Sequence, residues 1–349
     1  MTPTSLVDRI ETPHGLFLCF ADVPIRVTTN DSDVCAQLAS YFRPYVISAA
    51  PPAAEVRLIQ GSVPIPGRFT DLMRAGGRRP KEATQEVEGG RLILKRATGV
   101  LMGLWPGGGF AAGDIRKNLN QGINLINNCY AKVILRRGHV LLHASAVSRK
   151  GRTAVLAGPP GAGKSTSALH LVEAGFHCLS NDRVMAKPMP DMVEVLGYPK
   201  QPRVNPGTLL GHPRLSVLLE PADRSALAAL PPAELWELER KSDVDLDSIY
   251  GTGTVELRGC MDTLVLLRWR RDGRGLDVRR LSVDEALAAL PLVEKNLGAF
   301  DLDRAPGTAM TPAEYQAYRE LFGRVTVVEV TGGVAFDGLV GVVDRLLSA

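Results

Sequence analysis

The most informative stretch of this chain is Gly158-Pro159-Pro160-Gly161-Ala162-Gly163-Lys164-Ser165-Thr166, which satisfies the pattern G-x-x-x-x-G-K-[ST] at every defined position. Before it, residues 153–157 form a short apolar run that predicts a buried strand. After it, residues 165–174 have helical character and are followed by Gly175, a helix stop signal. The order strand, glycine loop, helix predicts a phosphate-binding loop of the Walker A type.

This loop assigns cofactor-binding roles to its own residues. Backbone N–H groups of a glycine loop point at phosphate oxygens, with the positive end of the helix dipole behind them. We expect Lys164 to reach the outer phosphates and the Ser165 hydroxyl to help hold Mg²⁺. The predicted nucleotide contacts are Gly158, Gly161, Ala162, Gly163, Lys164, Ser165 and Thr166.

Composition bounds the class of protein. The chain has 349 residues with a formal net charge of +4, and it contains no dense Lys/Arg stripe interleaved with aromatic residues, so we predict no nucleic-acid partner. No apolar run approaches the ~20 residues that cross a bilayer, and no secretory signal is apparent. The five cysteines are scattered and form no C-x-x-C pair, which favours reduced thiols. We therefore expect a cytoplasmic location and no membrane association.

The pattern of apolar runs predicts two domains of different character. Residues 1–112 combine several short strands with one helix and predict an N-terminal α+β domain of unknown role. Residues 113–349 carry the glycine loop and predict an α/β catalytic domain.

Three further groups surround the loop in order along the chain. His143 lies in an apolar strand before the loop strand, and Asn181-Asp182-Arg183 follows the loop helix. Glu256-Leu257-Arg258-Gly259 comes about ninety residues after Lys164. Each group has a simple structural alternative: a core histidine, a surface ion pair, or salt-bridge residues on one strand face.

Together with the loop, these groups resemble the HPr kinase/phosphorylase family, whose catalytic domain is related in fold to phosphoenolpyruvate carboxykinase. That family has a His before the loop strand, a G-x-x-x-x-G-K-S loop, an Asp-Asp-Arg segment and an E-x-R-G signature. The resemblance covers roughly residues 138–300, and it fits a divergent HPr kinase-like group best.

The resemblance implies an ATP- and Mg²⁺-dependent phosphotransferase that uses an alcohol group as acceptor. It implies that Ser165, Asp182 and Glu256 are metal ligands, directly or through water. Arg258 would stabilise charge on the transferring phosphoryl group, and His143 would touch phosphate or position the acceptor. Lys164 and Lys295 complete the implied catalytic set, with Lys295 taken from the position of the family's late basic segment. The resemblance also implies a homo-oligomer.

One departure from the family concerns the catalytic base. The family's first aspartate is Asn181 here, and a neutral amide cannot accept a proton as a carboxylate does. Asp182 must then act as the base, or the site has no dedicated one. The alternative function is an ATP-binding regulatory protein without turnover.

A proline-rich segment predicts where the acceptor binds. Residues 197–207 carry Lys200, Arg203 and Asn205 between prolines, which preset an extended backbone. These side chains would face an anionic ligand, unless the segment is an exposed connector. The acceptor itself stays open between a protein serine and a small hydroxylated metabolite.

Overall fold

The computed structural model describes residues 1–73 and 79–348, and these form two compact units. The first unit comprises residues 1–138 together with 296–310, and the second comprises 139–295 together with 311–349. The expected boundary at residue 112 therefore differs from the observed one, because the long helix after it belongs to the first unit. Among the described residues, no helix combines the length and apolar character needed to span a membrane.

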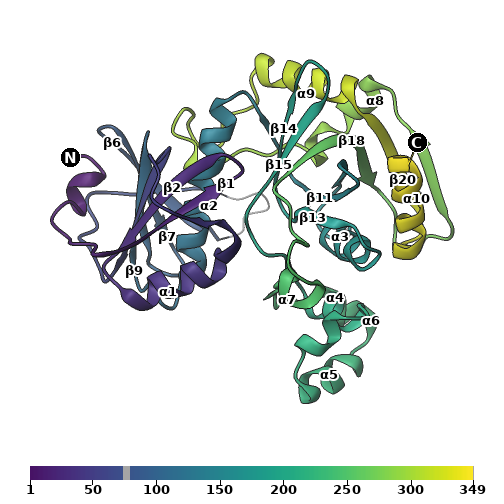
Figure 1. Cartoon of the computed structure of the whole chain (residues 1–349), viewed down its shortest axis with the longest axis horizontal. Helices are drawn as coiled ribbons and strands as arrows, with labels where there is room; N and C mark the ends of the chain where they lie inside the picture. The colour runs from purple at the N-terminus through teal and green to yellow at the C-terminus, as the bar shows by residue number, and fades with distance from the viewer. Residues whose placement is uncertain (74–78, 349) are drawn as a thin grey trace. The chain divides into compact units, whose positions relative to one another are not determined.

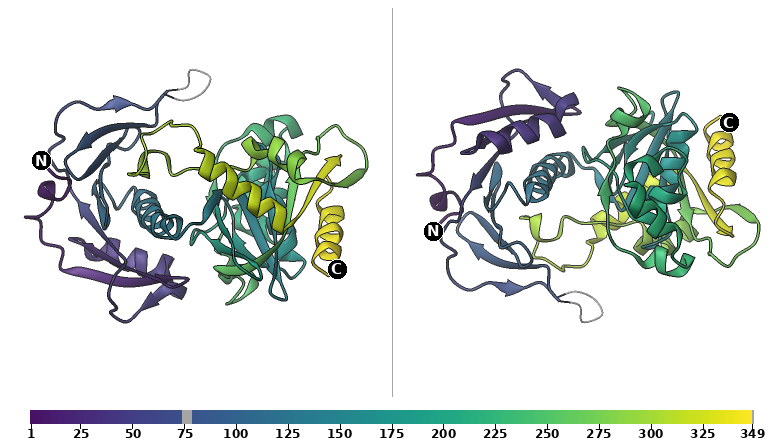
Figure 2. Two further views of the ribbon diagram at one scale, coloured as in Figure 1. Left: turned by 90° about the horizontal axis from the view of Figure 1, so that it is seen from above. Right: turned by 90° about the horizontal axis from the view of Figure 1, so that it is seen from below.

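The first unit is built on a mixed sheet in the order β3-β1-β2-β4-β9-β8-β7-β6-β5. Helix α2 packs on β4 and β9 of this sheet, and the sheet's core includes Leu58 and Phe110. Figure 2 shows this helix beside the strands of the first unit. Its elements are β1 (His14–Phe20), β2 (Val23–Thr29), α1 (Ser32–Tyr41), β3 (Val46–Ile47), β4 (Ala54–Gln60), β5 (Thr70–Asp71), β6 (Glu82–Val87), β7 (Gly90–Lys95), β8 (Leu101–Trp105), β9 (Gly108–Gly113) and α2 (Leu119–Arg136).

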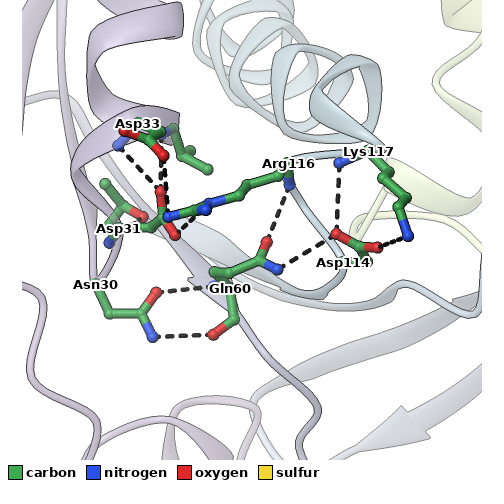
Figure 3. Close-up of polar contacts among 9 residues, drawn as sticks. Asn30, Asp31, Asp33, Gln60, Asp114, Arg116 and Lys117 are labelled. Carbon is green, nitrogen blue, oxygen red and sulfur yellow. Dashed lines mark hydrogen bonds and ion pairs between the residues drawn. The ribbon is translucent and has the colours of Figure 1, made fainter.

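A polar network within the first unit joins α1, β4 and the segment before α2 (Figure 3). Asp31 caps α1 by accepting hydrogen bonds from its first backbone amides, and it also accepts one from Arg116 Nε at 2.7 Å. Gln60, at the end of β4, donates to Asp114 Oδ1 at 3.3 Å and accepts from the Arg116 amide at 2.9 Å. Asn30 pairs with the backbone of Gln60 in both directions. These bonds fix the path of the chain into α2.

The second unit contains the glycine loop and a sheet in the order β10-β14-β15-β18-β12-β11-β13, with β20 beside β18 and β19 beside β20 (Figure 1). Both units are thus mixed α/β structures. The strands are β10 (Val140–Leu142), β11 (Ala144–Arg149), β12 (Arg152–Ala157), β13 (His177–Ser180), β14 (Val184–Pro188), β15 (Val193–Gly197), β16 (Arg203–Val204), β17 (Ser242–Asp243), β18 (Arg258–Leu267), β19 (Leu276–Arg280) and β20 (Thr326–Gly332).

Helices pack on this sheet, and further short helices adjoin them. Helices α3 and α10 contact each other and both contact β12, and a group of short helices, α4 to α7, adjoins α3 (Figure 1). The core between them gathers Leu169, Leu209 and Val265. The helices are α3 (Lys164–Glu173), α4 (Pro206–Gly211), α5 (Pro221–Ala228), α6 (Pro232–Glu237), α7 (Leu246–Tyr250), α8 (Val283–Ala288), α9 (Pro312–Arg324) and α10 (Phe336–Ser348).

Candidate active site

The glycine loop connects the end of β12 directly to the start of α3. Gly163 precedes the helix with φ of 82°, a left-handed conformation that suits glycine. Gly158 has φ of 154°, and a Cβ there would lie 2.5 Å from the carbonyl oxygen of Leu267. Both positions therefore require glycine, and the loop takes the strand–loop–helix form that the sequence predicts.

Lys164 is held against the loop that it follows. Its side chain is buried, and Nζ donates to the carbonyl oxygens of Gly158 at 2.8 Å and Pro159 at 3.2 Å. Burial lowers the pKa of Lys164, while the carboxylate of Asp182 opposes that shift. The ammonium is thus positioned where a phosphate on the loop would meet it.

A cavity of about 840 Å³ opens beside the loop. It is lined by loop residues from Pro160 to Thr166 and, on other sides, by His143, Asp182 and Asn205. Thr166 also contacts α4, because its hydroxyl oxygen lies 2.9 Å from that of Thr208.

One wall of the cavity is aromatic. Trp269 follows β18 and donates from Nε1 to the carbonyl oxygen of Ala162 at 2.8 Å, and Phe336 of α10 meets it edge-on with ring centroids 5.4 Å apart. Trp236 of α6 lies under the guanidinium of Arg271, which is 4.3 Å from the ring centroid. This wall offers flat apolar faces next to the phosphate loop.

Polar side chains also line the cavity. His143 Nε2 lies 3.8 Å from Asp182 Oδ1. The segment that carries Lys295 pairs with β10: the Lys295 amide donates to Leu141 at 3.0 Å, and the His143 amide donates to Val293 at 2.7 Å. His143, Lys164, Asp182 and Lys295, which are predicted to act together, are therefore brought together.

The electrostatics of this group favour a neutral imidazole. Burial, reinforced by the charges of Lys164 and Lys295, lowers the pKa of His143 to about 4, and Asp182 only partly offsets this. Lys295 has a pKa lowered by burial and by Arg183. At neutral pH, His143 would therefore both donate and accept a hydrogen bond without adding charge.

Two amide oxygens at the cavity lack a partner among the residues that the structure describes. Asn181 Oδ1 and Asn205 Oδ1 are both buried in this way, and both side chains line the cavity. The Asn181 backbone is fixed, because Ser145 Oγ donates to its carbonyl oxygen at 2.6 Å. Such oxygens can accept a hydrogen bond from a ligand or coordinate a hard cation.

The predicted acceptor residues also reach this region. Lys200 and Arg203 line a second, smaller cavity of about 180 Å³ that shares Ser165 and Asp182 with the larger one. Asn205 lines the larger cavity. The segment is therefore not an exposed connector at these three positions.

Glu256 and Arg258 are not brought to the cavity, which corrects their expected place beside the loop. Strands β12 and β18 pair in parallel from Arg152↔Cys260 to Ala157↔Leu266, so Arg258 lies at the end of the sheet opposite the loop. At ~3.3 Å per residue, β12 alone separates these ends by roughly 16 Å. Glu256 instead accepts a hydrogen bond from Ser148 at 2.7 Å, and Arg258 Nε lies 3.5 Å from Glu194.

Sequence reasoning missed the aromatic wall and two cations, Arg271 and Lys241. Trp269 comes two residues after the end of β18, so its place beside the loop follows once β18 is paired in parallel with β12. Trp236, Arg271 and Lys241 come from separate segments and carry no local signal for this location.

Comparisons with known proteins add little to this description. No protein-family model and no curated protein sequence matches the chain. Among solved structures, the chain is similar to the Hpr(Ser) kinase/phosphatase from Coxiella burnetii, over 60% of this chain and 93% of that one, at 10% identity and a TM-score of 0.29. A likeness at this level carries no conclusion about this chain's fold or function.

Proposed function

We propose that this protein is an ATP- and Mg²⁺-dependent kinase that transfers the γ-phosphoryl group to a hydroxyl of an acceptor. The observation that carries the proposal is the meeting of Lys164 with Asp182 and His143 at one cavity beside a glycine loop. A cation and loop amides bind phosphate, and a carboxylate next to them serves a metal or an acceptor proton.

The cavity suits the parts of ATP in order. Phosphates would lie on the loop amides at the start of α3, held by Lys164. The nucleobase would contact the aromatic wall of Trp236, Trp269 and Phe336, since stacking surfaces of this kind bind flat rings. The γ-phosphate would then face His143 and Asp182.

The oxygen donors near the loop suit Mg²⁺ better than a metal ion that is coordinated by protein side chains alone. Among residues 1–73 and 79–348, no group of three or more His, Cys, Asp or Glu side chains is arranged to hold a metal ion. Mg²⁺ usually takes one or two carboxylates together with phosphate oxygens and water. Asp182 would provide one carboxylate and Ser165 a hydroxyl oxygen, and Glu256 lies elsewhere. When bound, the ion would neutralise charge on the phosphates.

The phosphoryl transfer from ATP to the acceptor hydroxyl can be written with the groups at this site. The acceptor oxygen forms a bond to the γ-phosphorus, the bond from that phosphorus to the β–γ bridging oxygen breaks, and ADP leaves. The hydroxyl proton passes to the Asp182 carboxylate or to water. Lys164 and Lys295 offset the negative charge on the phosphoryl oxygens, and phosphoryl transfer depends mainly on such positioning and charge stabilisation.

Transfer of label from ATP tests this proposal. The purified full chain is incubated with γ-labelled ATP and Mg²⁺, together with either a protein-free metabolite extract or a protein extract. The same assay is run with Lys164→Ala and with the control Lys150→Ala, which alters an exposed residue in the β11–β12 turn. We expect a discrete labelled product with the wild type and the control, and a loss of at least a hundredfold with Lys164→Ala, because an interaction with transferring phosphate is removed.

Two results would contradict the proposal. Equal transfer by Lys164→Ala would remove the glycine loop from the reaction. Detectable ATP binding with neither transfer nor hydrolysis would favour the regulatory alternative, to which the amide of Asn181 at the base position also points.

A further inference from the structure

The smaller cavity beside the phosphate loop carries an excess of positive charge. Its lining contains Lys200, Arg203, Lys241 and one carboxylate, Asp182, and Asp243 lies 2.9 Å from Arg203 Nε. Lys241 and Arg203 also line the larger cavity, so the two spaces share their charged boundary. An excess of fixed positive charge in a recess attracts anions and raises their local concentration.

These cations sit on a backbone that is held in place. Lys200 and Arg203 lie on either side of the buried Pro202. Ser180 Oγ accepts a hydrogen bond from the Tyr198 amide at 3.0 Å, and this bond joins the segment to the end of β13. Arg203 pairs with Asp243 across β16 and β17, and its guanidinium donates to the carbonyl oxygen of Lys241 at 3.2 Å. A preorganised site loses less entropy when it binds a ligand.

The cavity also lies where an acceptor must lie. Ser165 and Asp182, at the expected position of the γ-phosphate, belong to its lining. Asn181, whose buried side-chain oxygen has no partner among the described residues, lines it too. The lining therefore offers oxygens that can accept a hydrogen bond from a hydroxyl and cations that can bind an anion.

The space is large enough for a small molecule. The volume is about 180 Å³, whereas one water needs about 10–15 Å³ by this measure. It would hold a compact organic ion completely, but only the side-chain tip of a protein substrate.

We propose that the phosphoryl acceptor is a small hydroxylated molecule with a phosphate or carboxylate group, which binds Lys200, Arg203 and Lys241. This inference rests on the proposed kinase function and names its substrate class. The hydroxyl donates a hydrogen bond to Asp182 or Asn181. Its oxygen then bonds to the γ-phosphorus of ATP, ADP leaves, and the proton goes to Asp182 or water.

Fractionation of the metabolite extract provides the first test. The extract is passed over an anion exchanger at neutral pH, and the flow-through and the salt eluate are each assayed for acceptance of label from γ-labelled ATP. We expect acceptor activity in the eluate. Activity confined to the flow-through, or found only with the protein extract, overturns the inference while leaving the kinase function intact.

A pair of matched substitutions provides the second test. Lys200→Met removes a charge at the cavity but keeps most of the side-chain stem, and Lys150→Met makes the same change in the β11–β12 turn. With the active eluate, we expect the acceptor KM to rise roughly tenfold to a hundredfold for Lys200→Met only, since a charged hydrogen bond is lost. The KM for ATP should stay unchanged. An unaltered acceptor KM overturns the inference.

A binding measurement keeps the inference testable if no turnover is found. The protein is first saturated with Mg²⁺ and a non-hydrolysable ATP analogue, so that the phosphate loop is filled, and is then titrated with glycerol 3-phosphate, glycerate and glycerol by calorimetry. We expect saturable binding of at least one of the two anions, lost in Lys200→Met and kept in Lys150→Met, and none of glycerol. Failure to bind either anion, or equal binding by Lys200→Met, rejects the anion site.

Discussion

His143 shows how one side chain takes its chemistry from its surroundings. The imidazole is half-buried between Lys164 and Lys295, and either cation would be repelled by a second positive charge. A protonated histidine would also compete with Lys164 for Asp182. The neutral form leaves the carboxylate available to an acceptor proton or a metal.

A titration of His143 by NMR tests this environment. We expect a midpoint near pH 4 in the folded protein, against about 6.5 for an unperturbed histidine. Because the folded pKa is the lower one, the unfolded chain binds the proton more readily. The stability that neutral His143 contributes is therefore complete above pH 6.5 and is lost as the pH falls towards 4.

The control for this titration is His143→Gln, which cannot be protonated. Its free energy of unfolding should fall less than that of the wild type between pH 7 and pH 4. A His143 midpoint at or above 6.5 would contradict the described surroundings.

Helix α9 packs against β10, the strand that leads to His143, and also against β14 and β20. Its residue Tyr318 is buried and donates from its hydroxyl to the carbonyl oxygen of Leu141, on the strand that leads to His143. The helix begins with a capping box, which consists of two hydrogen bonds. The Glu314 amide donates to Thr311 Oγ1 at 3.2 Å, and the Thr311 amide donates to the Glu314 carboxylate at 2.7 Å. Pro312 suits the first helical position.

Removal of this cap should weaken the protein measurably. Thr311→Ala leaves backbone amides of α9 without a partner, and the expected loss is about 1 kcal/mol of unfolding free energy. Urea denaturation would measure it, with Thr252→Ala at an exposed loop position as the control. Equal stability of the two variants would show that the cap contributes nothing.

Local signals account for part of the second unit, and non-local pairing accounts for the rest. The glycine loop was predictable because it depends on residues next to one another. The sequence also indicated Lys200 and Arg203 as acceptor-binding residues, because prolines mark their segment. By contrast, the position of Glu256 depends on how β18 pairs with β12, and no local pattern encodes that register.

The division of the molecule into two units depends on a segment far along the chain. Residues 296–310 return to the first unit after most of the second has been completed. Arg91 of β7 holds this segment: its guanidinium donates to the carbonyl oxygens of Ala299, Asp301 and Arg304, while Nε contacts Glu86. Apolar runs cannot predict such a return, because the bonds involve backbone carbonyls.

Arg91→Met should destabilise the protein more than most arginine substitutions. The Arg91 side chain is almost fully buried, and its loss leaves three buried or partly buried carbonyl oxygens without this donor, so the expected cost is about 2–4 kcal/mol. Arg96→Met, which breaks an exposed pair with Asp71, should cost under about 1 kcal/mol. Similar melting temperatures for both variants would contradict the role of Arg91.

The same return has a consequence for biosynthesis. The carbonyl groups that Arg91 binds are 208 to 213 residues further along the chain. At about 5–20 residues per second, the ribosome needs roughly 10–40 s after making Arg91 before the last of them exists. During that interval the nascent first unit keeps a charged guanidinium in its unfinished interior. The amino-terminal part of this chain is thus made first and completed among the last.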